Sequence, residues 1–220
     1  VYYQRKIEER KLIMTAFILI IIAAVSYLTG SINTAILVGR LKGDDIRSHG
    51  SGNAGATNAL RTYGKAAGIA VVAGDCLKAA VSCLFGILIA HITPLGSGNV
   101  KLAIYAAGLG AVLGHNFPLY FGFKGGKGIL VSITALIFAD WKIGVAVLII
   151  SLVLIAVTKY VSLGSVTGAV LFIVLPLIFE RWNYPYIIFC LILSLLAIYR
   201  HRENISRLIS GNERKLGSKK

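Results

Sequence analysis

Apolar runs long enough to cross a lipid bilayer alternate with short polar stretches along this chain. The runs lie near residues 12–41, 66–90, 102–120, 129–139, 143–158, 166–179 and 186–199. A helix needs about 20 apolar residues to cross a hydrocarbon core of about 30 Å, and lipid tolerates only helices or closed barrels as spanning structures. The alternating strands of a barrel are not visible in the sequence. The pattern therefore predicts an all-α fold, a polytopic membrane bundle of about seven transmembrane helices.

Charge interrupts the longest apolar stretch. Residues 129–158 are apolar except for the segment Asp140-Trp141-Lys142 and a few small polar side chains. One helix of that length would overshoot the bilayer core and bury both charges, which is costly in lipid. We therefore expect two helices here, Ile129–Ala139 and Ile143–Thr158.

Basic residues in the connections indicate which face of the membrane each connection occupies. If successive helices cross the membrane in opposite directions, the connections on one side contain only Lys101, Lys142 and Arg181. The other side collects the remaining basic connections, namely Arg40, Lys42, Arg47, Arg61, Lys65, Lys124, Lys127, Lys159 and the Lys and Arg residues of 200–220. Since cytoplasmic loops are rich in Lys and Arg, this side is predicted to be cytoplasmic, with the N-terminus outside and the C-terminus in the cytoplasm.

The first residues do not fit this arrangement. Arg5, Lys6, Arg10 and Lys11 would lie outside, against the same rule, and the only methionine is Met14. We expect residues 1–13 to be an N-terminal extension that precedes the native start. Residues 14–200 then form the transmembrane domain, and residues 201–220 form a basic cytoplasmic tail.

Composition excludes a soluble protein and narrows the partners. The 220 residues are 56% hydrophobic and only 15% charged, with a mean hydropathy of +0.77. The net charge of +14 is not carried by basic runs interleaved with aromatic residues, so anionic lipid and anionic substrates explain it better than nucleic acid. Cys76, Cys83 and Cys190 lie in apolar runs without the spacing of a metal site or a disulfide. We expect no metal and no cofactor.

The stretch from Gly50 to Asn58 is the most polar segment between two apolar runs. Glycines let backbone N–H groups approach a ligand closely, and a run of such groups forms a nest for an anion. We predict that this loop and its neighbours bind phosphate through Arg47, Ser51, Gly52, Asn53, Gly55, Thr57, Asn58 and Arg61. The spacing also matches a dinucleotide fingerprint, but no buried strand precedes it. A flexible loop with helix-capping side chains is the alternative.

Three other polar clusters carry candidate ligands, and two of them have a plain structural alternative. The segment 114–128 supplies His115, Asn116, Lys124, Gly126 and Lys127, which form either an anion site before a helix or a basic membrane anchor. The segment 159–165 supplies Ser162 and Ser165. After the last apolar run, His201 and Asn204 share one helical face, in either a ligand site or an interfacial basic helix.

One pair of charges lies inside an apolar run. Asp75 and Lys78 stand three residues apart in the run of residues 66–90, so a helix places them on one face. Ionisable groups at membrane depth are either functional or paired with each other. We expect a pair that organises the glycine loop, with direct ligation of substrate as the second interpretation.

Taken in order, these stretches resemble the successive motifs of a known family. They read DIRSHGSGNAGATN with LRTYGK, GHNFPLYFGFKGGKG, KYVSLGS and HRENISRLISGNE. Motifs of this kind are similar to those of the acyl-phosphate:glycerol-3-phosphate acyltransferase family of bacterial membranes. The resemblance runs from Tyr27 to Glu213, with Ala54 in place of a bulkier aliphatic residue and Asn33 in place of a frequent proline.

The resemblance implies a reaction. A member of this family transfers a fatty acyl group from acyl phosphate to the sn-1 hydroxyl of glycerol 3-phosphate, giving lysophosphatidic acid and phosphate, the first acylation of phospholipid synthesis. Residues 14–200 would then be a transmembrane acyltransferase domain in the bacterial cell membrane, with its active site facing the cytoplasm. Functional coupling to the soluble enzyme that makes acyl phosphate is a further expectation.

The chemistry suits a site without a protein nucleophile. Acyl phosphate carries a good leaving group, so a positioned hydroxyl and stabilised phosphate oxygens suffice. No histidine has an aspartate five positions later, and no serine triad is visible. We expect substrate-assisted catalysis, in which the dianionic phosphate of glycerol 3-phosphate takes the proton. The candidate catalytic residues are His201, Asn204, Asp75 and Lys127.

Two other functions fit part of the pattern. A small anion or metabolite transporter would also carry basic loops and a buried Asp75–Lys78 pair, but transporters place polar groups near the midplane on broken helices. A membrane lipid phosphatase would need a nucleophile or a metal cluster, and neither is visible.

Overall fold

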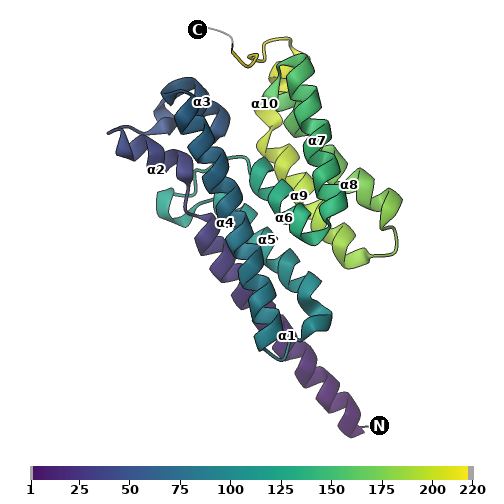
Figure 1. The fold of residues 1–220 in the computed structure, drawn as a ribbon. Coiled ribbons are helices and arrows are strands. Elements are labelled where there is room, and N and C mark those ends of the chain that lie inside the picture. The colour runs from purple at the N-terminus through teal and green to yellow at the C-terminus, as the bar shows by residue number, and fades with distance from the viewer. Residues whose placement is uncertain (1, 218–220) are drawn as a thin grey trace.

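The computed structural model describes residues 2–217. Within that range, helices are the only regular secondary structure, and loops connect them (Figure 1). The α-helices are α1 Tyr2–Gly30, α2 Thr34–Leu41, α3 Ala56–Tyr63, α4 Lys65–Ile92, α5 Val100–Asn116, α6 Ile129–Ala139, α7 Trp141–Thr158, α8 Val161–Phe179, α9 Tyr184–Arg200 and α10 Arg202–Ile209. Short 3-10 turns occur at Ile46–Ser48, Ser97–Asn99 and Leu119–Phe121. The predicted all-α membrane fold is confirmed.

The helices form two groups that meet at α6. Helix α5 packs against α1 and α4 in one group, and α8 packs between α7 and α9 in the other. Helix α6 contacts α4 and α5 on one side and α7 on the other, so it lies between the groups (Figure 1). Its buried Val131, Ala135 and Leu136 belong to the largest apolar cluster of the molecule.

Small residues allow α1 and α5 to pack backbone to backbone. A Cβ atom added to Gly110 would lie 2.3 Å from the Ala23 carbonyl oxygen, and one added to Gly114 would lie 2.1 Å from that of Tyr27. This is the small-residue spacing by which helices associate in lipid, where apolar side chains gain little from leaving the bilayer. The contact fixes the end of α5, which carries His115.

Within residues 2–217, five helical segments are long and apolar enough to span a bilayer, and α9 with α10, bent by 60° at their junction, would make a sixth. Helix α6 has only 11 residues, about 16 Å at 1.5 Å per residue, roughly half of a bilayer core. Each of the seven predicted runs is helical, but the number of true crossings and the orientation of the termini stay predictions.

The predicted break between α6 and α7 is confirmed. Helix α6 ends at Ala139 and α7 begins at Trp141, with Asp140 between them. The Asp140 carboxylate accepts hydrogen bonds from the backbone N–H groups of Lys142 (3.0 Å) and Ile143 (3.2 Å). The charge that breaks the apolar run therefore also caps the following helix.

The first apolar run is divided where the sequence has polar residues. Helix α1 ends at Gly30, and Asn33 caps α2 by accepting from the Ile36 N–H at 3.0 Å. At the other end, residues 2–13 continue α1 without interruption. The expected boundary between an extension and a native domain at residue 13 stays a prediction.

Candidate active site

Four polar segments, far apart in the sequence, line one cavity of about 350 Å³. They come from the loop before α3, the loop before α6, the start of α8, and α10 with the chain that follows it. The predicted site residues among the lining are Ser51, Asn53, Gly55, Thr57, Asn58, Arg61, Asp75, His115, Lys127, Ser162, Ser165, His201 and Asn204. The structure thus brings most of the polar motifs to one place.

A second part of the cavity wall is apolar apart from the Ser151 hydroxyl of α7. It is formed by Val72 of α4, by Ile129, Leu130 and Ile133 of α6, and by Leu148, Leu152 and Ile155 of α7. One continuous cavity therefore has a polar end at the connections and an apolar side between the two helix groups. Such a cavity suits an amphipathic molecule with an anionic head.

The glycine loop before α3 is held by the side chain of Asn58, which lies in α3. Asn58 accepts from the Ser51 N–H (3.3 Å) and donates to the carbonyls of Ile46 (3.1 Å) and His49 (2.9 Å). A Cβ atom on Gly50, whose φ is +60°, would lie 2.2 Å from the Asn58 side-chain oxygen. Asn58 lines the cavity, but these bonds make it the organiser of the loop. Among the described residues no side chain caps the α3 N-terminus at Gly55. Gly55, Ala56 and Thr57 line the cavity, so the partial positive charge of this helix end is available to an anion there.

The loop before α6 presents Lys127. Arg200 donates to the carbonyls of Gly125 (3.1 Å) and Gly126 (3.0 and 2.8 Å), and the Gly126 N–H donates to the His115 carbonyl (3.1 Å). A Cβ atom on Gly126 would lie 2.1 Å from His115 Nε2. The backbone is therefore pressed against α5 in a way only glycine allows.

Lys127 itself lies among other cations with little water. Its ammonium group donates to the side-chain oxygen of Asn204. Burial and, to a lesser extent, the nearby Arg207 guanidinium lower the pKa of Lys127 to about 8, while the Glu213 carboxylate opposes the shift. A bound anion would complete the charge balance.

The opposite wall holds buried hydroxyls and an imidazole. Ser162 and Ser165 lie three residues apart on α8 and are both buried; within residues 2–217, the Ser162 hydroxyl has no hydrogen-bond partner. His201, at the junction of α9 and α10, contacts the Ala197 carbonyl through Nδ1 at 2.8 Å. Because a carbonyl only accepts, Nδ1 carries the proton and the neutral ring leaves Nε2 as an acceptor.

A buried ionic cluster lies beneath the polar end. Lys78 Nζ is 2.9 Å from Asp75 Oδ1 and 2.8 Å from His115 Nδ1, and it donates to the Ile32 carbonyl at 3.1 Å. Asp75 Oδ1 is 3.4 Å from the same His115 nitrogen. Asp75 and His115 line the cavity, whereas Lys78 lies behind them. The predicted Asp75–Lys78 pair is confirmed. Through His115, whose carbonyl accepts from the Gly126 N–H, the pair is joined to the loop before α6. Its role in organising the glycine loop stays a prediction.

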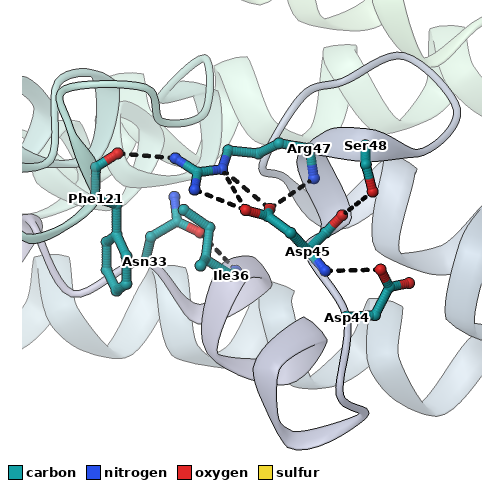
Figure 2. Close-up of polar contacts among 7 residues, drawn as sticks. All are labelled: Asn33, Ile36, Asp44, Asp45, Arg47, Ser48 and Phe121. Atoms are coloured by element: carbon teal, nitrogen blue, oxygen red, sulfur yellow. Dashed lines mark hydrogen bonds and ion pairs between the residues drawn. The ribbon is translucent and has the colours of Figure 1, made fainter.

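Six predicted ligands lie outside the cavity lining: Arg47, Gly52, Lys78, Asn116, Lys124 and Gly126. The Arg47 guanidinium is held by Asp45, through Nη2 at 2.7 Å, and donates to the Phe121 carbonyl at 2.8 Å (Figure 2). The Arg47 guanidinium in turn lowers the pKa of Asp45 to about 2. Arg47 therefore connects its own loop, through Asp45, to the segment that contains Phe121. Lys124 is exposed, and Asn116 is buried against Gly128.

The sequence did not single out Glu213, which lines the cavity with its side chain only 7% exposed. Its carboxylate accepts from Asn204 Nδ2 (3.2 and 3.3 Å) and from Arg207 Nε (3.0 Å). The only signal in the sequence is that Glu213 is one of two acidic residues, with Glu203, in a basic tail. Within residues 2–217, no group of three or more His, Cys, Asp or Glu side chains is arranged to hold a metal ion.

A helical membrane bundle with anion-binding groups and an apolar wall in one cavity defines an integral membrane protein that handles an amphipathic phosphate or carboxylate. The sequence profile described as "Glycerol-3-phosphate acyltransferase" matches residues 20–211. The chain belongs to the glycerol-3-phosphate acyltransferase family.

Relatives match over nearly the whole chain. The glycerol-3-phosphate acyltransferase of Thermoanaerobacter pseudethanolicus is 45% identical over 91% of this chain and 96% of its own length. That of Clostridioides difficile is 42% identical over 94% of this chain and 100% of its own length. The crystal structure of PlsY (YgiH), an integral membrane glycerol 3-phosphate acyltransferase, in its glycerol 3-phosphate form has a TM-score of 0.79 and 34% identity over 90% of this chain and 96% of that one.

Proposed function

We propose that this protein transfers a fatty acyl group from acyl phosphate to the sn-1 hydroxyl of glycerol 3-phosphate, giving lysophosphatidic acid and phosphate. The observation that carries the proposal is the single cavity with an anion-binding end and an apolar wall, in a chain of this family. Its solved relative PlsY is described in a glycerol 3-phosphate form and in a lysophosphatidic acid form. Substrate and product of that kind share a phosphate and differ by one acyl chain.

Two groups of donors are assigned to the phosphates. The first is the glycine loop with the uncapped N-terminus of α3, where Ser51, Asn53 and Thr57 line the cavity. The second is Lys127 with Asn204 and Arg207, which already form one bonded group with Glu213. Two separate phosphate-binding sites suit a reaction in which the acyl donor and the acceptor each carry a phosphate.

The apolar wall is assigned to the acyl chain. Ile133 of α6, Leu152 of α7 and Val72 of α4 come from helices on both sides of the cavity. Because α6 is short and lies between the two helix groups, a lipid tail can approach from the membrane while its head reaches the polar end. The acyl carbon would then lie where the two parts of the cavity meet.

Catalysis is assigned to positioning and to the substrate's own phosphate. The sn-1 oxygen forms a bond to the acyl carbon, and the bond from that carbon to the phosphate oxygen breaks, so phosphate leaves with the electron pair. The hydroxyl proton passes to the dianionic phosphate of glycerol 3-phosphate, whose second pKa is near 6. His201 Nε2, an acceptor in the neutral ring, is placed to hold a substrate hydroxyl rather than a phosphate oxygen.

The polar end is assigned to the cytoplasmic face of the bacterial cell membrane. Charge bias in the connections supports this orientation, and glycerol 3-phosphate is a water-soluble substrate. The acyl phosphate donor would come from a soluble enzyme that acts at the same membrane face.

The test uses purified protein in detergent with palmitoyl phosphate and radiolabelled glycerol 3-phosphate. We expect lysophosphatidic acid and phosphate in equal amounts without a sealed compartment. Active glycerol 3-phosphate uptake into vesicles with no acyl transfer in detergent would instead establish the transporter alternative. Palmitoyl-coenzyme A serves as a donor control that lacks the acyl phosphate group.

A further inference from the structure

The chain after α10 crosses the polar end of the cavity. We name residues 212–217 the tail strap. Its start is tied to α10 by the Asn212 N–H, which donates to the Arg207 carbonyl at 2.8 Å. Glu213 and Arg214 of the strap line the cavity directly.

Four further contacts fix the strap on both sides of the cavity. Arg61 of α3 donates to the carbonyls of Arg214 (3.0 Å) and Lys215 (3.5 Å). The Leu216 N–H donates to the Lys159 carbonyl, at the end of α7, at 2.7 Å. The Lys215 ammonium lies 5.5 Å from the ring centre of Tyr160, the residue before α8.

These contacts join elements that belong to different helix groups. Helix α3 packs on α4, whereas α7, α8 and α10 belong to the other group. In Figure 1 the chain runs from the end of α10 across the top of α7, on the side of the molecule where α3 also lies. The strap therefore bridges the two walls of the polar end.

The groups below the strap are shielded from solvent. His201 is 4% exposed and Asn204 is 8% exposed, although both follow the last long helix at a connection. The Glu213 carboxylate is turned inward onto Asn204 and Arg207. An open polar end would leave such groups in contact with bulk water.

We propose that the tail strap determines the acceptor specificity of the site, favouring the hydroxyl of glycerol 3-phosphate over water. The proposal rests on the proposed function. Water attacking acyl phosphate forms a bond to the acyl carbon and breaks the bond to the phosphate oxygen, giving fatty acid and phosphate while a proton passes to solvent. An acyl phosphate is activated enough that bulk water at the acyl carbon would waste the donor. Closing a site against water prevents such side reactions.

The experiment changes one strap contact and leaves the cavity residues in place. Leu216→Pro removes the N–H that bonds to Lys159, because proline has no backbone donor. Leu216→Ala is the matched control, since it keeps the N–H and shortens the side chain. With palmitoyl phosphate and saturating glycerol 3-phosphate, both phosphate release and lysophosphatidic acid formation are measured.

We expect Leu216→Pro to raise fatty acid formed per lysophosphatidic acid about five-fold, the change in strap opening expected for one lost hydrogen bond. Leu216→Ala should match the unmodified protein. An unchanged ratio in Leu216→Pro, with normal lysophosphatidic acid formation, would overturn the proposal. Absence of lysophosphatidic acid from the unmodified protein would overturn the proposed function instead, so the two failures are distinct.

A second variant guards against an effect of proline on folding. Arg61→Gln removes the clamp on the two strap carbonyls, and Arg61→Lys keeps the positive charge but loses the forked donors. We expect both to raise the ratio of hydrolysis to transfer. If Arg61→Gln lowers the rate of lysophosphatidic acid formation but leaves the amount of hydrolysis unchanged, Arg61 acts in phosphate binding alone. That result would contradict its role in the strap.

Discussion

Lys127 combines burial, neighbouring cations and a single amide partner, so its charge depends on pH within the working range. Its folded pKa of about 8 lies below the ordinary lysine value because of burial. The ammonium form therefore exists below pH 8 in the empty site and is lost as the pH rises through 8. A charge that binds phosphate is then lost under mildly alkaline conditions.

We expect the KM for glycerol 3-phosphate to rise about ten-fold for each pH unit above 8, because only the protonated enzyme binds the anion well. The substrate phosphate is already fully dianionic there, since its second pKa is near 6. Lys127→Arg keeps its charge and should abolish this rise. A KM that stays flat to pH 9.5 in the unmodified protein contradicts the assignment of Lys127 to phosphate.

Gly126 tests the contact between the loop before α6 and α5. A Cβ atom there would lie 2.1 Å from His115 Nε2, so the loop must shift and carry Lys127 with it. We expect Gly126→Ala to lower kcat/KM about 100-fold, a typical effect of a displacement of about 1 Å at a reaction site. Gly98→Ala is the control because nothing lies within 4 Å of that Cβ. Equal activity of the two folded variants would refute the positioning role.

Variants of His201 and Asp75 distinguish the two candidate proton acceptors, the substrate's phosphate and a protein side chain. If the substrate's phosphate is the base, His201→Gln should mainly raise the KM for glycerol 3-phosphate, and Asp75→Asn should act through His115 and the loop. If either side chain is the base, kcat at saturation should fall by 10²- to 10⁴-fold. Steady-state kinetics at saturating donor distinguish these results, and a fall in kcat with unchanged KM refutes substrate assistance.

At the scale of elements, the short helix α6 and the turn at Asp140 set the shape of the cavity. Asp140 ends one helix and caps the next, because its carboxylate accepts from the Lys142 and Ile143 N–H groups at the point where the apolar run is divided. We expect Asp140→Ala to lower the free energy of unfolding by about 1 kcal/mol. Asp140→Asn keeps an acceptor and should cost less, as measured by denaturation in detergent. Equal stability of all three proteins would show that the cap contributes nothing.

Apolar periodicity in the sequence predicted the long helices and the break at Asp140, because burial in lipid is decided by a residue's own character and its near neighbours. The polar clusters between the apolar runs placed Ser51, Lys127, Ser162 and His201 among the candidate site residues. The role of Arg47 depends on a partner two residues away competing for its guanidinium. Glu213 depends on where the tail folds, which no local pattern encodes.

At the scale of the molecule, the four polar segments that line the cavity lie at connections or helix ends that meet at its polar end, while Asp75 and Ser151 lie within α4 and α7. If that end is cytoplasmic, Ser51→Cys and Lys124→Cys, both exposed, should react with an impermeant maleimide only in inside-out vesicles. Lys142→Cys, exposed at the start of α7, should react only in right-side-out vesicles. Cys76, Cys83 and Cys190 are replaced first. Labelling of Ser51→Cys from outside would contradict the predicted orientation.

The tail strap also affects the order in which the parts of the site are assembled during synthesis. A ribosome makes residues 50–58 long before residues 212–217, so the growing chain inserts its helices and loops while the polar end still lacks Glu213 and Arg214. The site becomes complete only after residues 212–217 have been made. A chain that stops before residue 212 would keep its helices but lack the strap over the polar end. A tag inserted just after Leu216 would act on the strap, whereas the start of α1 lies at the other end of the molecule (Figure 1).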